Sequence, residues 1–442
     1  MTISSVRIPR ARLIVVALAV VAAAAILLLS RGYTFYFDEW DFILSAPDWG
    51  WSTYLQPHNE HPVMLPRLIY AALLSTVGLR SYVPYMVVLL ALHATSVVLL
   101  FELVRRRAGE LVGLACAALF LVLGAGWENL LWAFQIAFVG SVACGLGMLL
   151  ALEGPSSPLR RLAAALLLIA SLMFSGIGLC FAAAAATRLV LEPSRRRELA
   201  WFAPVAIALL AWYLAFGRTG MAAVPSARGF NLFMLPAYVG WGLAASASAI
   251  VGVTGVPALA VLALVAGAIG FAWWRCRPDP LALSVAAGLI TVYLLTGFTR
   301  AQLGYQQSAS GRYVYIGAVF WLILLADAAR LLPWWGTWRP ALAACLFLAC
   351  FNSGVLLVEY AAAKDAQMHR ETADLQALAA ERLDPCLNPN ASVDPLVMPQ
   401  VNNPALYYRA VDRYGDPATD QPVVDRVDFQ TAYRNLLRPG CR

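Results

Sequence analysis

Long continuous runs of apolar residues follow one another along most of the chain, with short polar stretches between them. A helix needs roughly 17–25 such residues to cross the hydrocarbon core of a bilayer. Continuous runs do not fit a membrane β-barrel, whose strands alternate apolar and polar residues. The runs lie at 13–30, 82–104, 111–125, 133–152, 162–175, 177–191, 199–216, 254–274, 281–298, 314–332 and 340–358. The pattern predicts an all-α polytopic membrane protein with about 11 transmembrane helices.

Basic residues set the predicted orientation, because loops rich in arginine stay in the cytoplasm. The clusters are at 7–12, 105–107, 160–161, 195–197 and 275–277. All of them face the cytoplasm if one further apolar segment, 234–252, is peripheral or re-entrant. We therefore expect a multi-pass protein of the cytoplasmic membrane with its N-terminus inside and its C-terminus outside. The sequence leaves open whether 234–252 crosses the membrane.

The predicted topology divides the chain into two parts. A transmembrane domain, 1–358, includes a long first extracytoplasmic loop, 31–81. The remaining segment, 359–442, is polar but keeps several aromatic residues, so we expect a small folded extracytoplasmic cap. Cys386 and Cys441 lie in it, and disulfides persist outside the reducing cytosol. A disulfide between these two cysteines is therefore expected.

Composition supports the membrane assignment. Hydrophobic residues make up 61% of the 442 residues and charged residues only 13%. This excludes a disordered chain and an ordinary soluble domain, in which about a quarter of the residues are charged. The net charge of +7 is explained by the cytoplasmic clusters, so nucleic acid is not an expected partner. Lys364 is the only lysine, as is typical of a GC-rich, bacterial genome.

An acidic group follows the first apolar run directly. Asp38, Glu39 and Asp41 stand among the aromatic residues of the segment 36–42. Crowded carboxylates at a low-dielectric boundary raise one another's pKa, so one of them could act as a base near neutral pH. They could also hold a divalent cation such as Mg²⁺ or Mn²⁺ through oxygen ligands. The alternative is an interfacial aromatic belt with solvated acids.

Three further polar groups lie at the predicted outer ends of helices. They are His58, Glu60 and His61 in the first loop, Trp127, Glu128 and Gln135 around the second, and Arg300, Gln302, Tyr305, Arg312 and Tyr313 in a later one. Imidazole, carboxylate and amide groups suit the wall of a sugar pocket, and indole rings stack on sugars. Arginine forks suit phosphate. Helix caps, headgroup anchors and a zinc site with a missing third ligand are the alternatives.

Taken together, the layout resembles the GT-C class of membrane glycosyltransferases. In that class a first transmembrane helix leads into a long outer loop that opens with an acidic motif, here Asp38-Glu39-Trp40-Asp41. Many hydrophobic helices and an extracytoplasmic C-terminal part follow. The resemblance implies transfer of a sugar from a polyprenyl-phosphate donor to a glycan, lipid or protein acceptor outside the cytoplasmic membrane, usually with inversion.

The resemblance also implies roles for individual residues. Asp38 is the first candidate for the general base and Glu39 the next, whereas Asp41 lies outside the usual adjacent pair. Arg312 and Arg300 are similar to the phosphate contacts of the class. The chain has no P-loop and no Rossmann glycine motif, in agreement with a lipid-linked donor rather than a sugar nucleotide.

Three other functions remain compatible with the sequence. A transporter or flippase for a lipid-linked glycan would also be polytopic, but it should carry ionisable residues near the middle of the membrane. A glycan ligase or polymerase would share the arginine loop, although an acidic cluster after the first helix is less expected there. A non-catalytic scaffold is the third possibility.

Overall fold

A computed structural model describes residues 3–220, 227–418 and 425–441. These residues are helical apart from loops and a short β-hairpin, which confirms the predicted all-α class. The chain forms two compact units. Unit 1 comprises Met1–Ala25, Leu55–Val63 and Leu89–Val358, and unit 2 comprises Ile26–Tyr54, Met64–Val88 and Glu359–Arg442.

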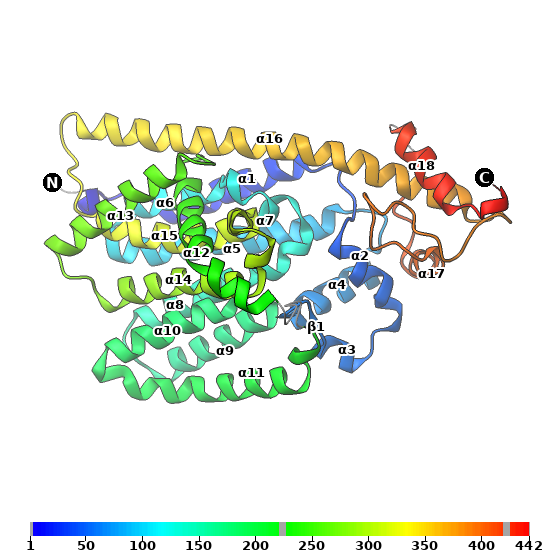
Figure 1. The fold of residues 1–442 in the computed structure, drawn as a ribbon. Coiled ribbons are helices and arrows are strands. Elements are labelled where there is room, and N and C mark those ends of the chain that lie inside the picture. Colours follow the sequence, from blue (N-terminus) through cyan, green and yellow to red (C-terminus); the bar gives the residue numbers. More distant parts are fainter. Residues whose placement is uncertain (1–2, 221–226, 419–424, 442) are drawn as a thin grey trace. The chain divides into compact units, whose positions relative to one another are not determined.

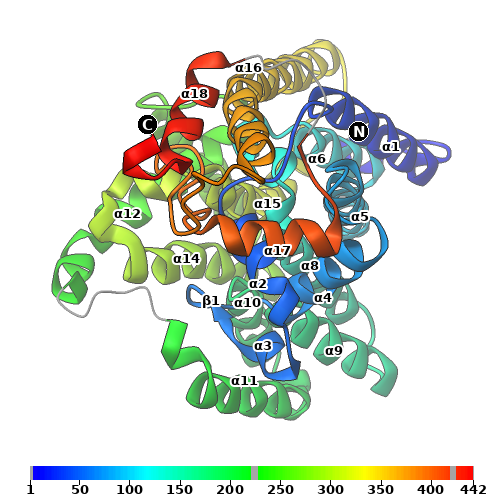
Figure 2. The same cartoon turned by 90° about the vertical axis from the view of Figure 1, so that its right-hand side faces the viewer.

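Unit 1 consists of packed helices and the hairpin. Its helices are α6 (Glu110–Leu121), α7 (Glu128–Leu131), α8 (Ile136–Glu153), α9 (Pro158–Phe174), α10 (Gly178–Leu191), α11 (Ala203–Ala215), α12 (Arg228–Ala249), α13 (Ala258–Arg275), α14 (Pro280–Arg300) and α15 (Gly311–Ala329). The hairpin strands are β1 (Pro57–His58) and β2 (His61–Pro62). α15 lies in the interior of the unit, in contact with α6, α12, α13 and α14 (Figure 2).

Unit 2 is built from the shorter helices. They are α2 (Asp38–Ser45), most of α3 (Trp51–Leu55), α4 (Met64–Thr76), α17 (Pro404–Tyr414) and α18 (Arg426–Leu436). The helices α1 (Ala11–Leu29), α5 (Val83–Ala108) and α16 (Trp338–Glu381) contribute residues to both units (Figure 1). A disulfide joins Cys386 to Cys441, which confirms the predicted pairing.

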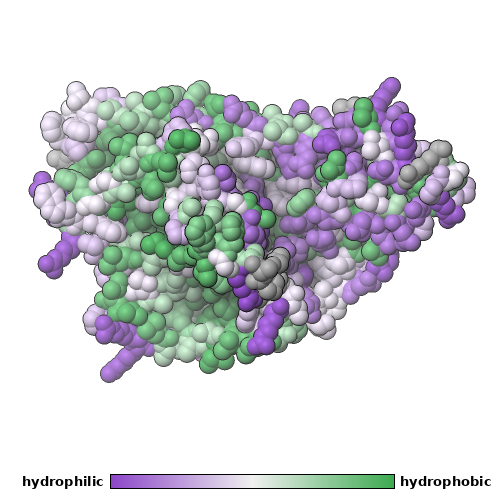
Figure 3. All heavy atoms as spheres, in the orientation of Figure 1, coloured by the Kyte–Doolittle hydropathy of each residue, from purple (hydrophilic) through white to green (hydrophobic). Residues whose placement is uncertain are grey.

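The surfaces of the two units differ in character. Unit 1 exposes many large apolar side chains, among them Leu13, Leu210, Leu264 and Phe347. In Figure 3 the helices of unit 1 are largely covered in hydrophobic residues. The side chains that unit 2 exposes are mainly hydrophilic (Figure 3). Unit 1 therefore suits a lipid environment and unit 2 an aqueous one.

In the described part of the chain, nine helices are long and apolar enough to cross a membrane, compared with about eleven predicted. Three of the predicted runs form helices that are not among the nine, with 12 residues in α6, 17 in α9 and 14 in α10, whereas α12 is added to the set. α6 ends at Leu121, because the backbone leaves the helical conformation at Val122 although the apolar run continues to residue 125. Apolarity alone therefore does not determine whether a run forms a helix of full length, and the number of membrane crossings stays a prediction.

The uncertain segment 234–252 forms most of α12. This helix has 22 residues and belongs to the nine by length and composition. Pro236 lies inside it, where a missing backbone donor commonly bends a helix. Figure 1 shows α12 running obliquely to α14 and α15, with which it packs. Such a course fits a tilted or re-entrant helix.

The last segment of unit 1 ends at Val358 and the last segment of unit 2 begins at Glu359, which is the position of the predicted domain boundary. The helix does not end there, because α16 continues to Glu381. The segments 26–54 and 64–88, which contain most of the first outer loop, belong to the same unit as the C-terminal segment. The C-terminal segment therefore shares its compact unit with two other parts of the chain, and its extracytoplasmic position stays a prediction.

An ion-pair network in unit 1 involves an arginine whose cluster we interpreted as a topology signal. Arg107, at the end of α5, lies 3.1 Å from Glu153 Oε1 and 3.2 Å from Asp327 Oδ1, and it also pairs with Asp279. Its side chain is only 9% exposed. Arg107 thereby ties α5 to α8, α14 and α15, a structural role that the sequence did not reveal.

Candidate functional site

The β-hairpin presents Glu60 and His61. β1 and β2 are antiparallel, with His58 opposite His61. Asn59 turns the chain with a φ of 52°, a left-handed conformation that asparagine tolerates better than most residues. A Cβ atom at Gly176 would lie 2.8 Å from His61 Nδ1, so a glycine allows the loop between α9 and α10 to approach this imidazole.

Glu60 forms an ion pair with Arg300 at the end of α14. Nε of Arg300 donates to Glu60 Oε1 at 3.0 Å, and its Nη2 donates to the same oxygen. His61 Nε2 lies 3.6 Å from this oxygen. The sequence predicted all three residues as substrate contacts, and the structure brings them together although Arg300 lies 240 positions from Glu60.

A second ion pair lies at the start of α15. Glu128 Oε2 is 2.9 Å from Arg312 Nε. The other oxygen of Glu128 accepts hydrogen bonds from Ser310 Oγ at 3.1 Å and from the Gly311 amide at 3.2 Å. This carboxylate thus caps the helix N-terminus, where a negative charge is stabilising. Glu128 therefore caps a helix, which was the alternative considered from the sequence, and it also pairs with Arg312.

Arg300 and Arg312 both have N–H groups that are not used in hydrogen bonds to the described residues. Nη1 of Arg300 and both Nη atoms of Arg312 donate no hydrogen bond to the described residues. Each carboxylate therefore fixes the orientation of its arginine while part of the fork stays available. Arg300 is 19% exposed and Arg312 24%, so both are partly shielded from water. A partly buried arginine fork of this kind suits a phosphate group.

Several buried polar atoms in unit 1 lack a hydrogen-bond partner among the described residues. Among them are Glu60 Oε2, His61 Nδ1, Asn129 Oδ1, Gln302 Oε1 and both amide atoms of Gln135. The Gln135 side chain is completely buried. Buried polar groups are almost always hydrogen-bonded to protein or water, so unpartnered atoms of this kind indicate a space that a polar ligand or water fills.

Burial controls the charge of the hairpin residues. It lowers the pKa of His61 to about 4, because the charged imidazolium loses its hydration. The imidazole is therefore neutral at neutral pH. For Glu60, burial alone would raise the pKa, but the facing His61 and Arg300 outweigh it and leave the pKa lowered. Glu60 is therefore ionised, and its charge is balanced by Arg300.

The other predicted substrate contacts take different positions. Tyr313 is buried, with its ring 5.9 Å from the Arg312 guanidinium. Gln302 donates to the Thr299 carbonyl at 3.1 Å, so it helps to close the end of α14. Tyr305 packs against Trp241, with 5.8 Å between the ring centroids. Trp127 is half-buried beside Glu128.

One residue that holds this region together was missed. Asn231 of α12 is completely buried. Its side chain accepts a hydrogen bond from the backbone N–H of Gln302 at 2.6 Å and donates one to the backbone carbonyl of Phe298 at 3.0 Å. It thereby fixes the turn that follows Arg300. A buried polar residue in an apolar helix was the available signal, because such residues in membrane proteins usually have a specific partner.

The acidic motif lies on α2, in unit 2. Asp38 is half-buried and Asp41 is exposed, and their carboxylate oxygens come within 4.8 Å of each other. Two oxygens at this spacing can serve one divalent cation, with further ligands from water or substrate. The candidate roles of Asp38 and Asp41 as base or metal ligand stay predictions.

Glu39 differs from its two neighbours, because its side chain is completely buried. Tyr70 donates to one of its oxygens at 2.6 Å, and Tyr82 and the Tyr36 amide donate to the other at 3.1 and 3.2 Å. Its two oxygens are thus engaged with α4, with the residue that precedes α5 and with its own loop. Among the three predicted catalytic carboxylates, Glu39 has the geometry of a structural group, and nothing in the acidic motif indicated this.

Burial also raises the pKa of Glu39 to about 8, against the smaller opposing effect of its hydrogen bonds. The folded protein therefore retains a proton that the unfolded chain releases above about pH 4.5. The stability that this carboxyl contributes is complete below that pH and is lost as the pH rises towards 8. In that interval the loss amounts to about 1.4 kcal/mol per pH unit.

We expect Glu39→Gln to flatten this dependence, because glutamine is neutral at every pH. Thermal unfolding of the purified protein between pH 5 and pH 8 measures the effect, and the wild type should lose more stability across the interval than the variant. Glu359→Gln, at an exposed glutamate of the same unit, serves as the control. Equal slopes for the wild type and Glu39→Gln would contradict the buried, protonated state.

Comparisons with known proteins give a limited result. No protein-family model matches the chain, and no curated protein matches it. Among solved structures, the chain is similar to the crystal structure of ArnT from Cupriavidus metallidurans bound to undecaprenyl phosphate. The identity is 15%, the match covers 96% of this chain and 85% of that chain, and the TM-score is 0.46. At this identity and TM-score the likeness assigns no function to the chain and no role to any side chain.

Proposed function

We propose that this protein is a membrane glycosyltransferase that moves a sugar from a polyprenyl-phosphate donor to an envelope glycan, lipid or protein acceptor. The observation that carries the proposal is the pair of carboxylate-oriented arginines, Arg300 and Arg312, at the ends of apolar helices. A lipid phosphate has its charge directly next to a hydrocarbon chain. A phosphate site at the end of apolar helices fits this kind of molecule.

The reaction breaks the bond between the sugar C1 and the donor phosphate oxygen and forms a bond from the acceptor oxygen to C1. The leaving polyprenyl phosphate gains negative charge, which the free donors of Arg300 and Arg312 can stabilise. Glu60 and Glu128 orient these donors before the substrate binds. The buried amide of Gln135 and the neutral imidazole of His61 offer hydrogen bonds of the kind that sugar hydroxyls accept and donate.

The acceptor hydroxyl must also lose its proton. We assign this step to Asp38, as the resemblance to the GT-C class implies, because its carboxylate is accessible where that of Glu39 is not. The arginines and Asp38 belong to different units, so their roles are tested separately. An inverting transfer follows if the base acts on the face opposite the leaving phosphate.

Asp38→Asn should abolish the sugar modification, because asparagine keeps the shape of the side chain and removes the base. Loss of a general base slows a reaction by about 100- to 10,000-fold. The measurement is the envelope glycan composition of a deletion strain that carries wild type or variant at matched protein levels. Asp412→Asn, at an exposed carboxylate that pairs with Arg382, is the control and should restore the glycan. Full restoration by Asp38→Asn would overturn the assignment of the base.

The transporter alternative is tested in vesicles that contain the purified protein. A transferase releases polyprenyl phosphate from the lipid-linked sugar when an acceptor is present. A flippase moves the lipid-linked sugar to the other leaflet without breaking this bond. Movement of the intact donor without release would overturn the proposed function.

A further inference from the structure

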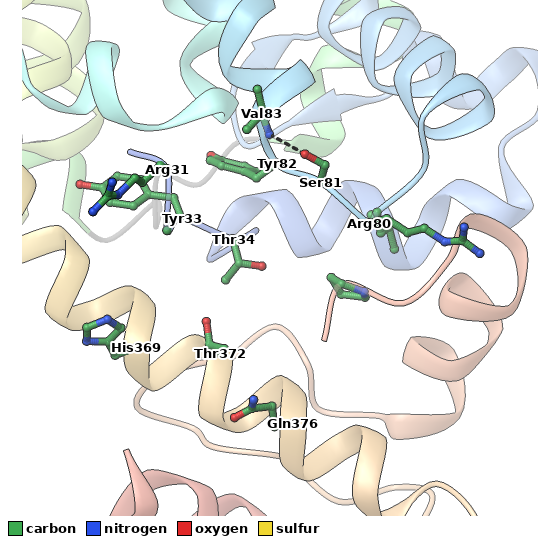
Figure 4. Close-up of a pocket in the computed structure, with 13 residues that line it drawn as sticks. Arg31, Tyr33, Thr34, Arg80, Ser81, Tyr82, Val83, His369, Thr372 and Gln376 are labelled. Carbon is green, nitrogen blue, oxygen red and sulfur yellow. Dashed lines mark hydrogen bonds between the residues drawn. The ribbon is translucent and has the colours of Figure 1, made fainter. Parts of the chain in front are cut away.

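Unit 2 contains a pocket to which the reaction described above assigns no role. Its volume is about 250 Å³, and it lies between the segment that follows α1, the start of α5 and the second half of α16 (Figure 4). Pockets for drug-sized molecules span roughly 300–1,000 Å³, so this one suits a smaller ligand, such as a single sugar ring.

The middle of the pocket is polar. Thr34 and Thr372 face each other across it, and Gln376 and His369 lie along the same side of α16 as Thr372 (Figure 4). The ring of Tyr82 forms part of the wall. Hydroxyl and amide groups next to an aromatic ring can bind the alternating hydroxyl and C–H surfaces of a sugar. This lining is therefore suited to a saccharide rather than to an apolar ligand.

The charge around the pocket is positive. Arg31 and Arg80 lie at opposite flanks, with their side chains extended away from the middle (Figure 4). Neither arginine pairs with a carboxylate in the described ranges. No aspartate or glutamate occurs among the described residues of the lining, although Asp365 lies one turn before His369 on α16, 3.7 Å from its imidazole and close to Gly32. A negatively charged ligand is therefore favoured at the rim.

All lining residues come from, or directly adjoin, segments that the sequence predicts to be extracytoplasmic, 31–81 and 359–442. We propose that this pocket binds a saccharide that carries a carboxylate or phosphate group. In the proposed glycosyltransferase, on which this part of the inference rests, the saccharide is a unit of the acceptor. The sugar ring occupies the space between Thr34 and Thr372, and its negative group lies towards Arg31 or Arg80.

Direct binding tests the proposal without any need for transfer. The full-length protein in detergent is titrated with glucuronate, glucose 6-phosphate, glucose and inorganic phosphate, and binding is followed by ligand-detected NMR. Both anionic sugars should bind about tenfold more tightly than glucose, since a hydrogen bond to a charged group contributes about 1.5–3 kcal/mol. A preference for one of the two identifies the anionic group. Inorganic phosphate that binds as tightly as glucose 6-phosphate would show a simple anion site and overturn the proposal.

Variants locate the binding. Thr372→Trp should fill the pocket and remove binding of both anionic sugars, whereas Thr431→Trp, at an exposed threonine of α18, should leave it unchanged. Arg31→Gln combined with Arg80→Gln changes exposed residues and does not threaten folding. It should leave glucose binding intact and reduce the preference for anionic sugars to less than about threefold. Unchanged binding in these variants would overturn the pocket assignment.

Binding and transfer measured together distinguish a failure of the pocket assignment from a failure of the proposed function. If the pocket is correct and the transferase is not, the anionic sugars bind but no polyprenyl phosphate is released. If the transferase is correct and the pocket is not, Thr372→Trp transfers sugar to its acceptor at the wild-type rate.

Discussion

Replacement of both Arg300 and Arg312 by alanine should reduce sugar transfer from a polyprenyl-phosphate donor by about 100- to 1,000-fold, the cost of losing a donor that stabilises developing charge. The leaving phosphate would then have no positive partner from this pair. Because Glu60 and Glu128 would remain as unpaired, partly buried carboxylates, they would repel the phosphate as well. Release of polyprenyl phosphate by membranes with equal amounts of protein measures the loss.

Two variants make this experiment specific. Arg228→Ala removes one positive charge from an exposed position on α12 and should leave transfer unchanged. Arg300→Lys keeps the charge but loses the planar fork, so its activity should lie between wild type and alanine. If the double alanine variant transfers sugar as fast as the wild type, the phosphate assignment is wrong.

A second large effect is expected on stability. Arg107→Ala should destabilise the protein by about 3–5 kcal/mol, because it removes the closest positive partner of the buried Asp327 carboxylate. Asp327 is only 5% exposed, and Glu153 and Asp279 also face the arginine. Thermal unfolding in detergent should show a clear decrease in Tm.

Arg106→Ala is the matched control, since it removes the same charge from the adjacent position. Arg106 is 38% exposed and lies 3.9 Å from Glu102, a pair that contributes little. Both changes weaken the positive cluster equally, so a difference in Tm isolates the buried network. Equal Tm values for the two variants would show that the network does not stabilise the fold.

The sequence predicted the fold well where a local property determines the structure. Continuous apolar runs predicted the helices, and most of the predicted runs have helices at the same positions. The boundaries were less accurate at Leu121, where α6 ends inside an apolar run, and at residue 358, where the helix continues into a polar segment. Hydropathy reports the environment of a segment, and the end of a helix depends on backbone conformation and capping as well.

The candidate site was predicted as a set of residues but not as an arrangement. Polar side chains at the ends of apolar segments are conspicuous in this chain, so Glu60, Glu128, Arg300 and Arg312 could be named individually. Their pairing depends on contacts across as many as 240 positions, which no local pattern encodes. In the same way, nothing in the acidic motif distinguishes Glu39 from Asp38, because only the packing of Tyr70 and Tyr82 buries the former.

The pocket in unit 2 was not predicted at all. Arg31, Arg80 and Thr372 are ordinary residues of three separate polar segments, and each of them alone suggests a solvated surface. The enclosed space depends on three segments that fold together. This is the kind of site that a sequence hides, because none of its members occupies an unusual position in its own segment.

The disulfide between Cys386 and Cys441 can report on which side of the membrane the C-terminal segment lies. A chain inserted with its C-terminus outside acquires the bond, and its two thiols react with an alkylating reagent only after reduction. A chain inserted the opposite way would keep both thiols in the reducing cytosol, where they would react at once. Alkylation of intact cells, followed by mass analysis of the C-terminal peptides, could therefore establish the orientation of the native protein without a fused tag.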